Sequence, residues 1–325
     1  MTPVPVPGRA GGILLRAPLP ADSVAALARL ARVHDLSGPG NGAIPQDAAA
    51  CRAICIVVTN GSIGLDAAAM AALPALGLIL CTGAGYEGVD LAAARARGIV
   101  VANAPGTNDR TVADHALALM LAIARDLVFL DRTVRDGMWD SVRQARPTPS
   151  GATLGLLGYG RIGQAIAARA RAFDMTILYH TRTPYPDPDA RHVPDLADMA
   201  RQADYLVVAC PGGPRTRHLV NATVLCALGP GGFLVNVGRG SVVDTDALAA
   251  ALLRGDIAGA ALDVVEGEPA VPPALLETGR VILTPHLAGR SPQARLAQKA
   301  LLENYVATYI QGGVLPDLAE QKAAT

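Results

Sequence analysis

Arg239, Glu268 and His286 are the side chains best suited to chemistry, and each follows an apolar, β-branched run typical of a strand. Open α/β sheets bind ligands at the carboxyl ends of their strands, so the three can face one cleft. There the arginine would bind a substrate carboxylate and polarise a carbonyl, and the histidine would protonate the carbonyl oxygen. The glutamate would fix the histidine tautomer and favour the imidazolium. These are the groups needed to reduce a 2-keto acid, although spacing alone does not establish it.

Four other histidines have no comparable setting. His34, His192 and His218 fall in polar or loop-like segments, and His115 lies within a helical run. We expect structural roles for all four.

A glycine-rich turn is the sharpest local signal in the sequence. Gly158-Tyr-Gly-Arg-Ile-Gly163 follows an apolar strand and opens a helix, which is the context of a dinucleotide-binding turn. Gly158 would permit the tight turn, Gly160 would let the backbone approach a pyrophosphate, and Gly163 would let helix and strand pack closely. The helix N-terminus would present unpaired N–H groups to the anion.

The end of the next expected strand indicates which dinucleotide binds. Where a ribose-binding carboxylate is expected, the chain has Tyr179-His-Thr181-Arg182-Thr183. Arg182 can make a charge-assisted contact with a 2′-phosphate, and the hydroxyl of Thr181 is beside it. The sequence therefore favours NADPH/NADP, with NADH possible but weaker.

The elements that must position these groups alternate along the chain, as in βαβ units with parallel sheets. We expect helices at 67–72, 91–97 and 111–130, and strands at 54–59, 78–81, 99–102, 153–157, 176–180, 205–209, 233–237, 258–263 and 281–284. The predicted fold class is α/β, with two doubly wound parallel-sheet domains.

Composition excludes several classes of protein. The chain has 325 residues, a 51% hydrophobic fraction and equal basic and acidic counts of 28 and 28. The hydrophobic fraction rules out global disorder, and the charge balance argues against a nucleic-acid binder. No run of residues looks like a signal peptide or a membrane span, and the odd number of cysteines, 5, without a C-x-x-C pair indicates reduced thiols. We expect a cytoplasmic protein without a metal centre.

With these motifs in place, the chain resembles the D-2-hydroxyacid dehydrogenase family over essentially its whole length. The matching motifs are Gly158–Gly163, Asn236-Val-Gly-Arg-Gly-Ser-Val-Val-Asp244, Asp263-Val-Val-Glu-Gly-Glu-Pro269, Thr284-Pro-His286, Gly83-Ala-Gly-Tyr-Glu-Gly-Val-Asp90 and Thr111-Val-Ala-Asp114. The order and spacing of Arg239, Glu268 and His286 suit that family's Arg–Glu–His triad.

The resemblance implies a flavodoxin-like substrate-binding domain, 1–103 plus 287–325, and a Rossmann dinucleotide-binding domain, 104–286, with the active cleft between them. The backbone N–H groups of Ala84 and Gly85 would hold the substrate carboxylate. The remaining cofactor contacts would come from Thr111, Arg161, Ile162, Pro211, Thr216, Val237 and Asp263. The family is usually homodimeric, so 129–150 is the expected dimerisation arm.

Several functions remain open at this stage. The segment after His180 resembles the NADP-linked glyoxylate and hydroxypyruvate reductases, but reductases of 2-ketogluconate or aromatic 2-keto acids are similar there. Arg290, where the family usually has a small residue, would favour a longer polar substrate or point to solvent. A nucleotide-sensing scaffold of the corepressor type is the alternative from another class. Oxidation of a phosphorylated hydroxy acid and of formate are disfavoured, the latter because Glu268 stands where that branch has Gln.

Overall fold

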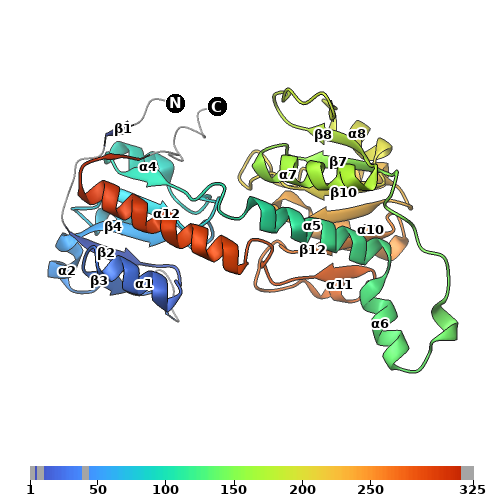
Figure 1. Ribbon diagram of the computed structural model, residues 1–325, viewed down its shortest axis with the longest axis horizontal. Helices are drawn as coiled ribbons and strands as arrows, with labels where there is room; N and C mark the ends of the chain where they lie inside the picture. The colour runs from blue at the N-terminus through green and yellow to red at the C-terminus, as the bar shows by residue number, and fades with distance from the viewer. Residues whose placement is uncertain (1–3, 6–10, 39–43, 316–325) are drawn as a thin grey trace. The chain divides into compact units, whose positions relative to one another are not determined.

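The protein, described by a computed structural model for residues 4–5, 11–38 and 44–315, forms two compact units. Unit 1 comprises residues 1–108 and 291–325, and unit 2 comprises 109–290 (Figure 1). The sequence predicts boundaries between the two units at 103/104 and 286/287, soon after the ends of two expected strands. The observed division lies four or five residues later, because each loop remains bonded to the sheet that it leaves: Ala104 N–H donates to Gly83 O, and His286 N–H donates to Asp263 O.

Unit 2 is built on a seven-stranded parallel sheet in the order β13-β12-β11-β10-β7-β8-β9. This is the strand order of dinucleotide-binding folds, in which the chain reverses direction across the sheet between β7 and β10. Val208 pairs with both Leu157 and Asn236, so β10, β7 and β11 end at one edge. The strands are β7 Thr153–Leu157, β8 Thr176–His180, β9 Arg191–His192, β10 Tyr205–Val208, β11 Phe233–Asn236, β12 Gly259–Leu262 and β13 Val281–Leu283.

Helices cover both faces of this sheet, because alternate strand residues point to opposite sides. Leu206 and Val208 join one core cluster, while Val207 between them joins the other. The helices of unit 2 are α5 Asp109–Ala124, α6 Leu127–Arg135, α7 Arg161–Ala170, α8 Leu196–Gln202, α9 Ala222–Leu228, α10 Thr245–Arg254 and α11 Pro273–Leu276, with 3₁₀ turns at Asp140–Val142, Arg171–Phe173 and Gly240–Val242.

The single helix expected over 111–130 is wrong, because the structure has two helices there. α5 ends at Ala124, and Asp126 adopts a left-handed backbone with φ of 59° before α6 begins. Aspartate is among the few residues that tolerate this conformation. The Asp126 carboxylate also accepts a hydrogen bond from Arg146 Nε at 3.0 Å. This bond holds the segment after α6 against the junction between α5 and α6.

Unit 1 is a five-stranded parallel sheet in the order β3-β2-β4-β5-β6, which is the flavodoxin-like order. Its last helix, α12, packs Tyr305 and Tyr309 into one of its two cores, so the C-terminal segment completes this unit. The strands are β2 Gly12–Leu15, β3 Val33–Asp35, β4 Ile54–Thr59, β5 Leu78–Cys81 and β6 Val100–Ala102; β1 Val4–Pro5 pairs antiparallel with β14 Val314–Leu315. The helices are α1 Ala21–Ala28, α2 Ala48–Ala53, α3 Ala67–Ala71, α4 Leu91–Ala96 and α12 Pro292–Ile310.

Within the described residues, no helix is both long and apolar enough to cross a membrane.

Candidate active site

Arg239, Glu268 and His286 follow three neighbouring strands of the unit 2 sheet, β11, β12 and β13. The strands are parallel, so their carboxyl ends lie at one edge. The segment of Arg239 also lies directly against the loop that carries Glu268, since a side chain on Gly240 would come within 2.1 Å of the Val265 carbonyl. Glycine is therefore required at position 240 for this close approach.

His286 and Glu268 form a direct pair. Nδ1 of His286 lies 2.5 Å from Oε1 of Glu268, and the two side chains are 42% and 33% exposed. A carboxylate can only accept, so Nδ1 carries the proton in this bond. Nε2 makes no hydrogen bond to any residue that the structure describes, which leaves it available to a ligand.

The backbone around His286 is strained and is held by a buried carboxylate. His286 has φ of 49°, in the left-handed region, which costs a non-glycine residue about 1–2 kcal/mol. Asp263, only 2% exposed, accepts hydrogen bonds from Thr284 Oγ1 at 2.6 Å and from the N–H groups of Leu287 and Ala288 at 2.9 and 2.8 Å. Both carboxylate oxygens are thus engaged by the loop, and these bonds offset the strain.

His115, for which the sequence predicted only a structural role, extends this network. Its Nε2 lies 3.1 Å from Thr284 Oγ1 and 3.6 Å from Asp263 Oδ1. Because the Thr284 hydroxyl donates to Asp263, it accepts from His115. A weak signal for this link is present in the sequence, a hydroxyl immediately before Pro285-His286, but nothing along the chain connects it to a histidine 169 residues away.

Arg239 is half-buried, and one of its N–H groups donates to Gly238 O at 2.7 Å. Asn236 fixes the backbone on both sides of the turn, because its side chain donates to Arg239 O and accepts from Gly238 N–H, each at 3.0 Å. The neighbouring Cys210 is buried, and burial raises the pKa of its thiol to about 12, so it remains neutral.

The backbone of the glycine-rich turn has the close contacts that its spacing predicts, and dinucleotide binding there stays a prediction. A side chain on Gly158, where φ is 100°, would come within 2.8 Å of Cys210 N, and one on Gly163 within 2.3 Å of Gly158 O. A side chain on Gly160 would meet nothing within 4 Å, so open space lies beside the start of α7. Gly160 is the N-cap of α7, with no side-chain cap, and leaves the first N–H groups for an anion.

Arg182 follows β8 beside this turn, because Gly158 N–H donates to His180 O at 3.0 Å. The Arg182 side chain is exposed and has no hydrogen-bond or ion-pair partner among the described residues. The Thr181 hydroxyl donates to Thr183 O at 2.7 Å. The next carboxylate along the chain, Asp187, is bonded to Tyr159 and Arg171 instead.

The other residues assigned to the cofactor site occupy the same edge of the sheet or the start of a helix. Thr216 Oγ1 donates to Pro211 O at 2.9 Å and closes the loop after β10. Arg161, in the first turn of α7, pairs with Asp109 at 2.5 Å. Ile162, Val237 and Thr111 are buried or half-buried, and their contacts with a cofactor stay a prediction.

Ala84 and Gly85, the expected carboxylate-binding residues, belong to unit 1 and follow β5. Asn103 Nδ2 donates to Ala84 O at 2.7 Å and fixes this loop. The N–H groups of Ala84 and Gly85 make no hydrogen bond to another described residue.

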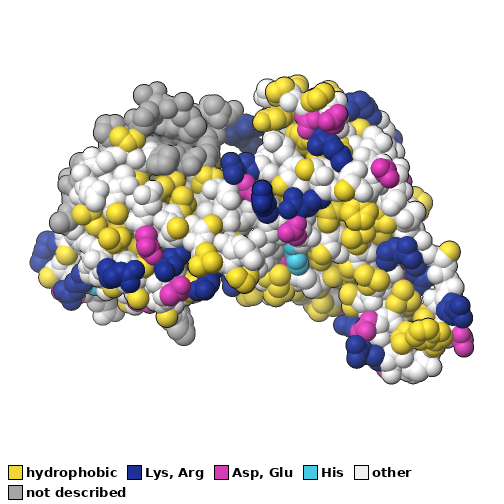
Figure 2. All heavy atoms as spheres, in the orientation of Figure 1, with side chains coloured by type: hydrophobic (Ala, Val, Ile, Leu, Met, Phe, Trp, Pro, Cys, Tyr) yellow, Lys and Arg dark blue, Asp and Glu magenta, His cyan; other side chains and the backbone are white. Residues whose placement is uncertain are grey.

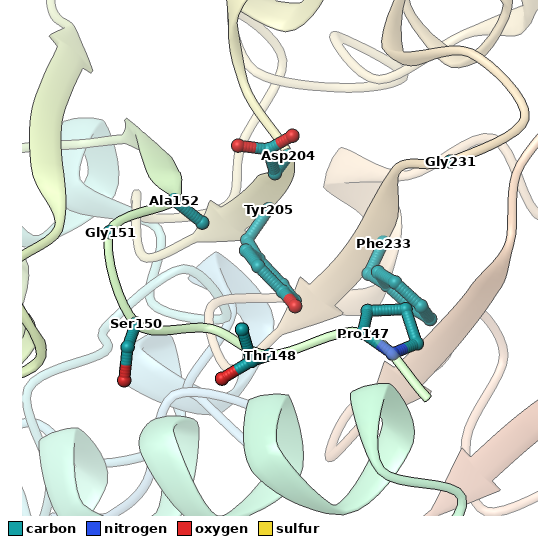
Figure 3. Close-up of a pocket in the computed structure, with 9 residues that line it drawn as sticks. All are labelled: Pro147, Thr148, Ser150, Gly151, Ala152, Asp204, Tyr205, Gly231 and Phe233. Atoms are coloured by element: carbon teal, nitrogen blue, oxygen red, sulfur yellow. The ribbon is translucent and has the colours of Figure 1, made fainter. Parts of the chain in front are cut away.

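Figure 3 shows a pocket that is separate from these groups. Its lining includes Thr148, Asp204, Tyr205 and Phe233, which lie near the amino ends of β7, β10 and β11. The pocket is therefore at the edge of the sheet opposite to His286. No cluster of potential metal ligands occurs among the residues that the structure describes.

Comparison with known proteins gives a consistent result. The sequence model described as "D-isomer specific 2-hydroxyacid dehydrogenase, NAD binding domain" matches residues 117–288. A glyoxylate/hydroxypyruvate reductase of Arabidopsis thaliana is 41% identical over 79% of this chain and 82% of that protein. A 2-ketogluconate reductase of Gluconobacter oxydans is 39% identical over 78% and 82%.

A solved structure shares the whole architecture. The NADPH-dependent glyoxylate/hydroxypyruvate reductase of Sinorhizobium meliloti, in complex with NADP and malonate, superposes with a TM-score of 0.87. It is 39% identical, and the match covers 96% of this chain and 98% of that one.

Proposed function

Because this chain belongs to the D-isomer specific 2-hydroxyacid dehydrogenase family, we propose that it reduces a short 2-keto acid to the D-2-hydroxy acid with NADPH. Glyoxylate and hydroxypyruvate are the first candidate substrates, since the relatives from A. thaliana and S. meliloti are named for them. The observation that carries the proposal is the His286–Glu268 pair, which follows two strands next to the one that Arg239 follows, at the same edge of the sheet.

The bound NADPH would supply a hydride to the carbonyl carbon. Arg239 would bind the substrate carboxylate and draw electron density from the carbonyl oxygen. His286 would give that oxygen a proton from Nε2, because Nδ1 is engaged by Glu268. Glu268 would hold the imidazole ring through its Nδ1–H and leave Nε2 for the transfer. The N–H groups of Ala84 and Gly85 are proposed to contribute to carboxylate binding.

NADPH is the proposed cofactor because Arg182 is exposed and unpaired within the described residues, while the first carboxylate after β8, that of Asp187, is bonded to Tyr159 and Arg171. Arg182→Ala should raise the apparent KM for NADPH about tenfold or more and leave that for NADH nearly unchanged, because only NADPH carries the 2′-phosphate. Arg254→Ala, which removes an exposed arginine from α10, is the control. An equal rise in the apparent KM for NADPH and for NADH would show that Arg182 does not bind the 2′-phosphate.

The substrate is tested by measuring oxidation of NADPH and NADH with glyoxylate, hydroxypyruvate, phenylpyruvate and 2-ketogluconate. The second candidate is 2-ketogluconate, because the G. oxydans relative is named for it and Arg290 is exposed without a partner in the described residues. Preference for NADPH with glyoxylate or hydroxypyruvate supports the proposal. Tight cofactor binding without turnover of any of these acids would instead favour a nucleotide-sensing scaffold of the corepressor type.

A homodimer is proposed from an exposed apolar surface of unit 2, the arm at residues 129–150. It includes Phe129, Met138 and Trp139, between 49% and 63% exposed. Figure 2 shows hydrophobic side chains gathered over α6 and the segment after it. Apolar surface of this kind is typical of a protein interface.

A further inference from the structure

The loop that carries Arg182, residues 181–190, is closed at its base by two histidines. The His192 ring lies with Nε2 2.9 Å from Thr181 O, and His180 Nδ1 lies 3.0 Å from Val193 O. These contacts fix where the loop leaves and rejoins the sheet. They do not reach its middle, where most residues are exposed.

A carboxylate in the middle of the loop is bonded to two other segments. Asp187 Oδ2 accepts from Tyr159 Oη at 2.6 Å and from Arg171 at 2.9 Å. Tyr159 lies between the first two glycines of the glycine-rich turn, and Arg171 begins the 3₁₀ turn after α7. Asp187 therefore joins the loop to the segment that would hold the pyrophosphate.

Aromatic contacts support the same link. The rings of Tyr159 and Tyr179 are stacked with centroids 4.2 Å apart, and both residues are 2% exposed. Tyr179 Oη donates to Tyr185 O at 2.7 Å and accepts from Tyr185 N–H at 2.9 Å. The loop is thus anchored at residues 185 and 187 by two tyrosine hydroxyls from the nucleotide-binding edge.

The charges in this cluster suit a nearby phosphate. Hydrogen bonds from Tyr159 and Arg171 hold the pKa of Asp187 below its usual range. Its ion pair with Arg171 compensates a negative charge that would otherwise oppose a 2′-phosphate. Arg182 has no such partner among the described residues and keeps its charge available.

We propose that Tyr159 and Asp187 are positioning residues that set the preference for NADPH over NADH by fixing the loop in which Arg182 stands. The inference rests on the proposed function, in which Arg182 binds the 2′-phosphate. Neither residue needs to touch the phosphate itself. Their bond holds the loop in one arrangement, so that binding does not have to order it.

Tyr159→Phe is the sharpest test, because it removes one hydroxyl and leaves the stacked ring and every charge in place. Loss of a hydrogen bond to a carboxylate predicts an approximately tenfold higher KM for NADPH, with little change for NADH or in kcat. Trypsin should also cleave the native chain after Arg182 about tenfold faster, since the loop opens more often.

Tyr205→Phe is the matched control. Tyr205 is also 2% exposed, but its hydroxyl has no partner among the described residues and lines the pocket at the opposite edge of the sheet. The Tyr205→Phe change should alter neither the KM for NADPH nor the rate of trypsin cleavage after Arg182.

The remaining outcomes overturn the inference in different ways. Faster cleavage with an unchanged KM for NADPH would show that loop order does not set cofactor preference. Equal increases in the KM for NADPH and the KM for NADH would show that Tyr159 has only a structural role. A wild-type protein that prefers NADH would overturn the proposed cofactor and this inference together, whereas NADPH preference unaltered by Tyr159→Phe would overturn the inference alone.

Discussion

At the scale of single residues, most hydrogen-bonding atoms of His286 and Asp263 already have a partner within the chain. His286 has one nitrogen committed to Glu268 and the other without a partner in the described chain. Asp263 has both oxygens committed to the loop that carries His286. In the proposed reaction, Nε2 of His286 is therefore the nitrogen left to donate the proton.

His286→Ala should lower kcat by at least about 100-fold with little change in the dissociation constant of NADPH, because a general acid acts on the chemical step. Glu268→Gln should cause a smaller loss, since an amide keeps a hydrogen bond but cannot stabilise the imidazolium. Steady-state kinetics and a fluorescence titration with NADPH measure the two effects. Equal losses in turnover and cofactor binding would contradict the assigned role.

The cysteines should differ sharply in reactivity. Burial raises the pKa of Cys81 and of Cys210 to about 12, so both remain protonated and unreactive up to strongly alkaline pH. Cys226 is exposed. Mass spectrometry after brief treatment with N-ethylmaleimide at neutral pH should show modification at Cys226 before either buried thiol, and activity should persist. Early labelling of Cys210 with loss of activity would contradict this.

At the scale of elements, the loop after β13 joins α5, β12 and β13. His115 comes from α5, Asp263 follows β12, and Thr284 follows β13. A shift of any one of these elements would change the position of His286, whose left-handed backbone is held by the same bonds. The loop that carries His286 is thus positioned by the packing of α5 against the unit 2 sheet.

Thr284→Val should destabilise the protein by about 1.5–3 kcal/mol, because it removes a hydrogen bond to a buried carboxylate and leaves His115 without its acceptor. Urea unfolding measures the change. It should also lower kcat more than it raises the KM for NADPH. In the control Thr278→Val, the lost bond runs to Leu275 O at the end of a short helix, so the loss should stay below about 1 kcal/mol. Equal losses of unfolding free energy in the two variants would contradict a special contribution of the Thr284 hydrogen bonds to stability.

These elements also show what the sequence can and cannot predict. The strands β4, β5, β7 and β8 have the expected bounds, because each is a short segment rich in apolar residues. The break at Asp126 was missed, since apolar residues resume at Leu127 directly after Arg125 and Asp126, and a left-handed backbone leaves no pattern in the sequence. Strand ends and motif spacing also predicted that Arg239, Glu268 and His286 follow strands of one sheet, as they do in the structure, and their catalytic roles stay a prediction. The contacts of His115 and Asp187 were not predicted, because they join residues far apart in the sequence.

At the scale of the whole molecule, the chain leaves unit 1 at Asn108 and returns to it at Ser291, so unit 2 is an insertion. Unit 1 needs both of its segments, because a side chain on Gly77 would come within 2.1 Å of the Tyr309 hydroxyl on α12. Unit 2 has its own two cores and carries the arm on its surface. A second copy bound at the arm would therefore contact unit 2.

The arm should make the protein a dimer, which sedimentation velocity at micromolar concentration measures. The combined change Phe129→Asp and Trp139→Asp should yield monomers, because each charge would be buried without a partner in an apolar interface. Leu276→Asp is the control: Leu276 is 60% exposed on α11, outside the arm, and its replacement should leave the dimer intact. Both arm residues are at least half-exposed in the protomer, so the double variant should keep its fold, as circular dichroism would show. A wild-type monomer, or dissociation by Leu276→Asp as well, would mean that the apolar arm does not join two copies.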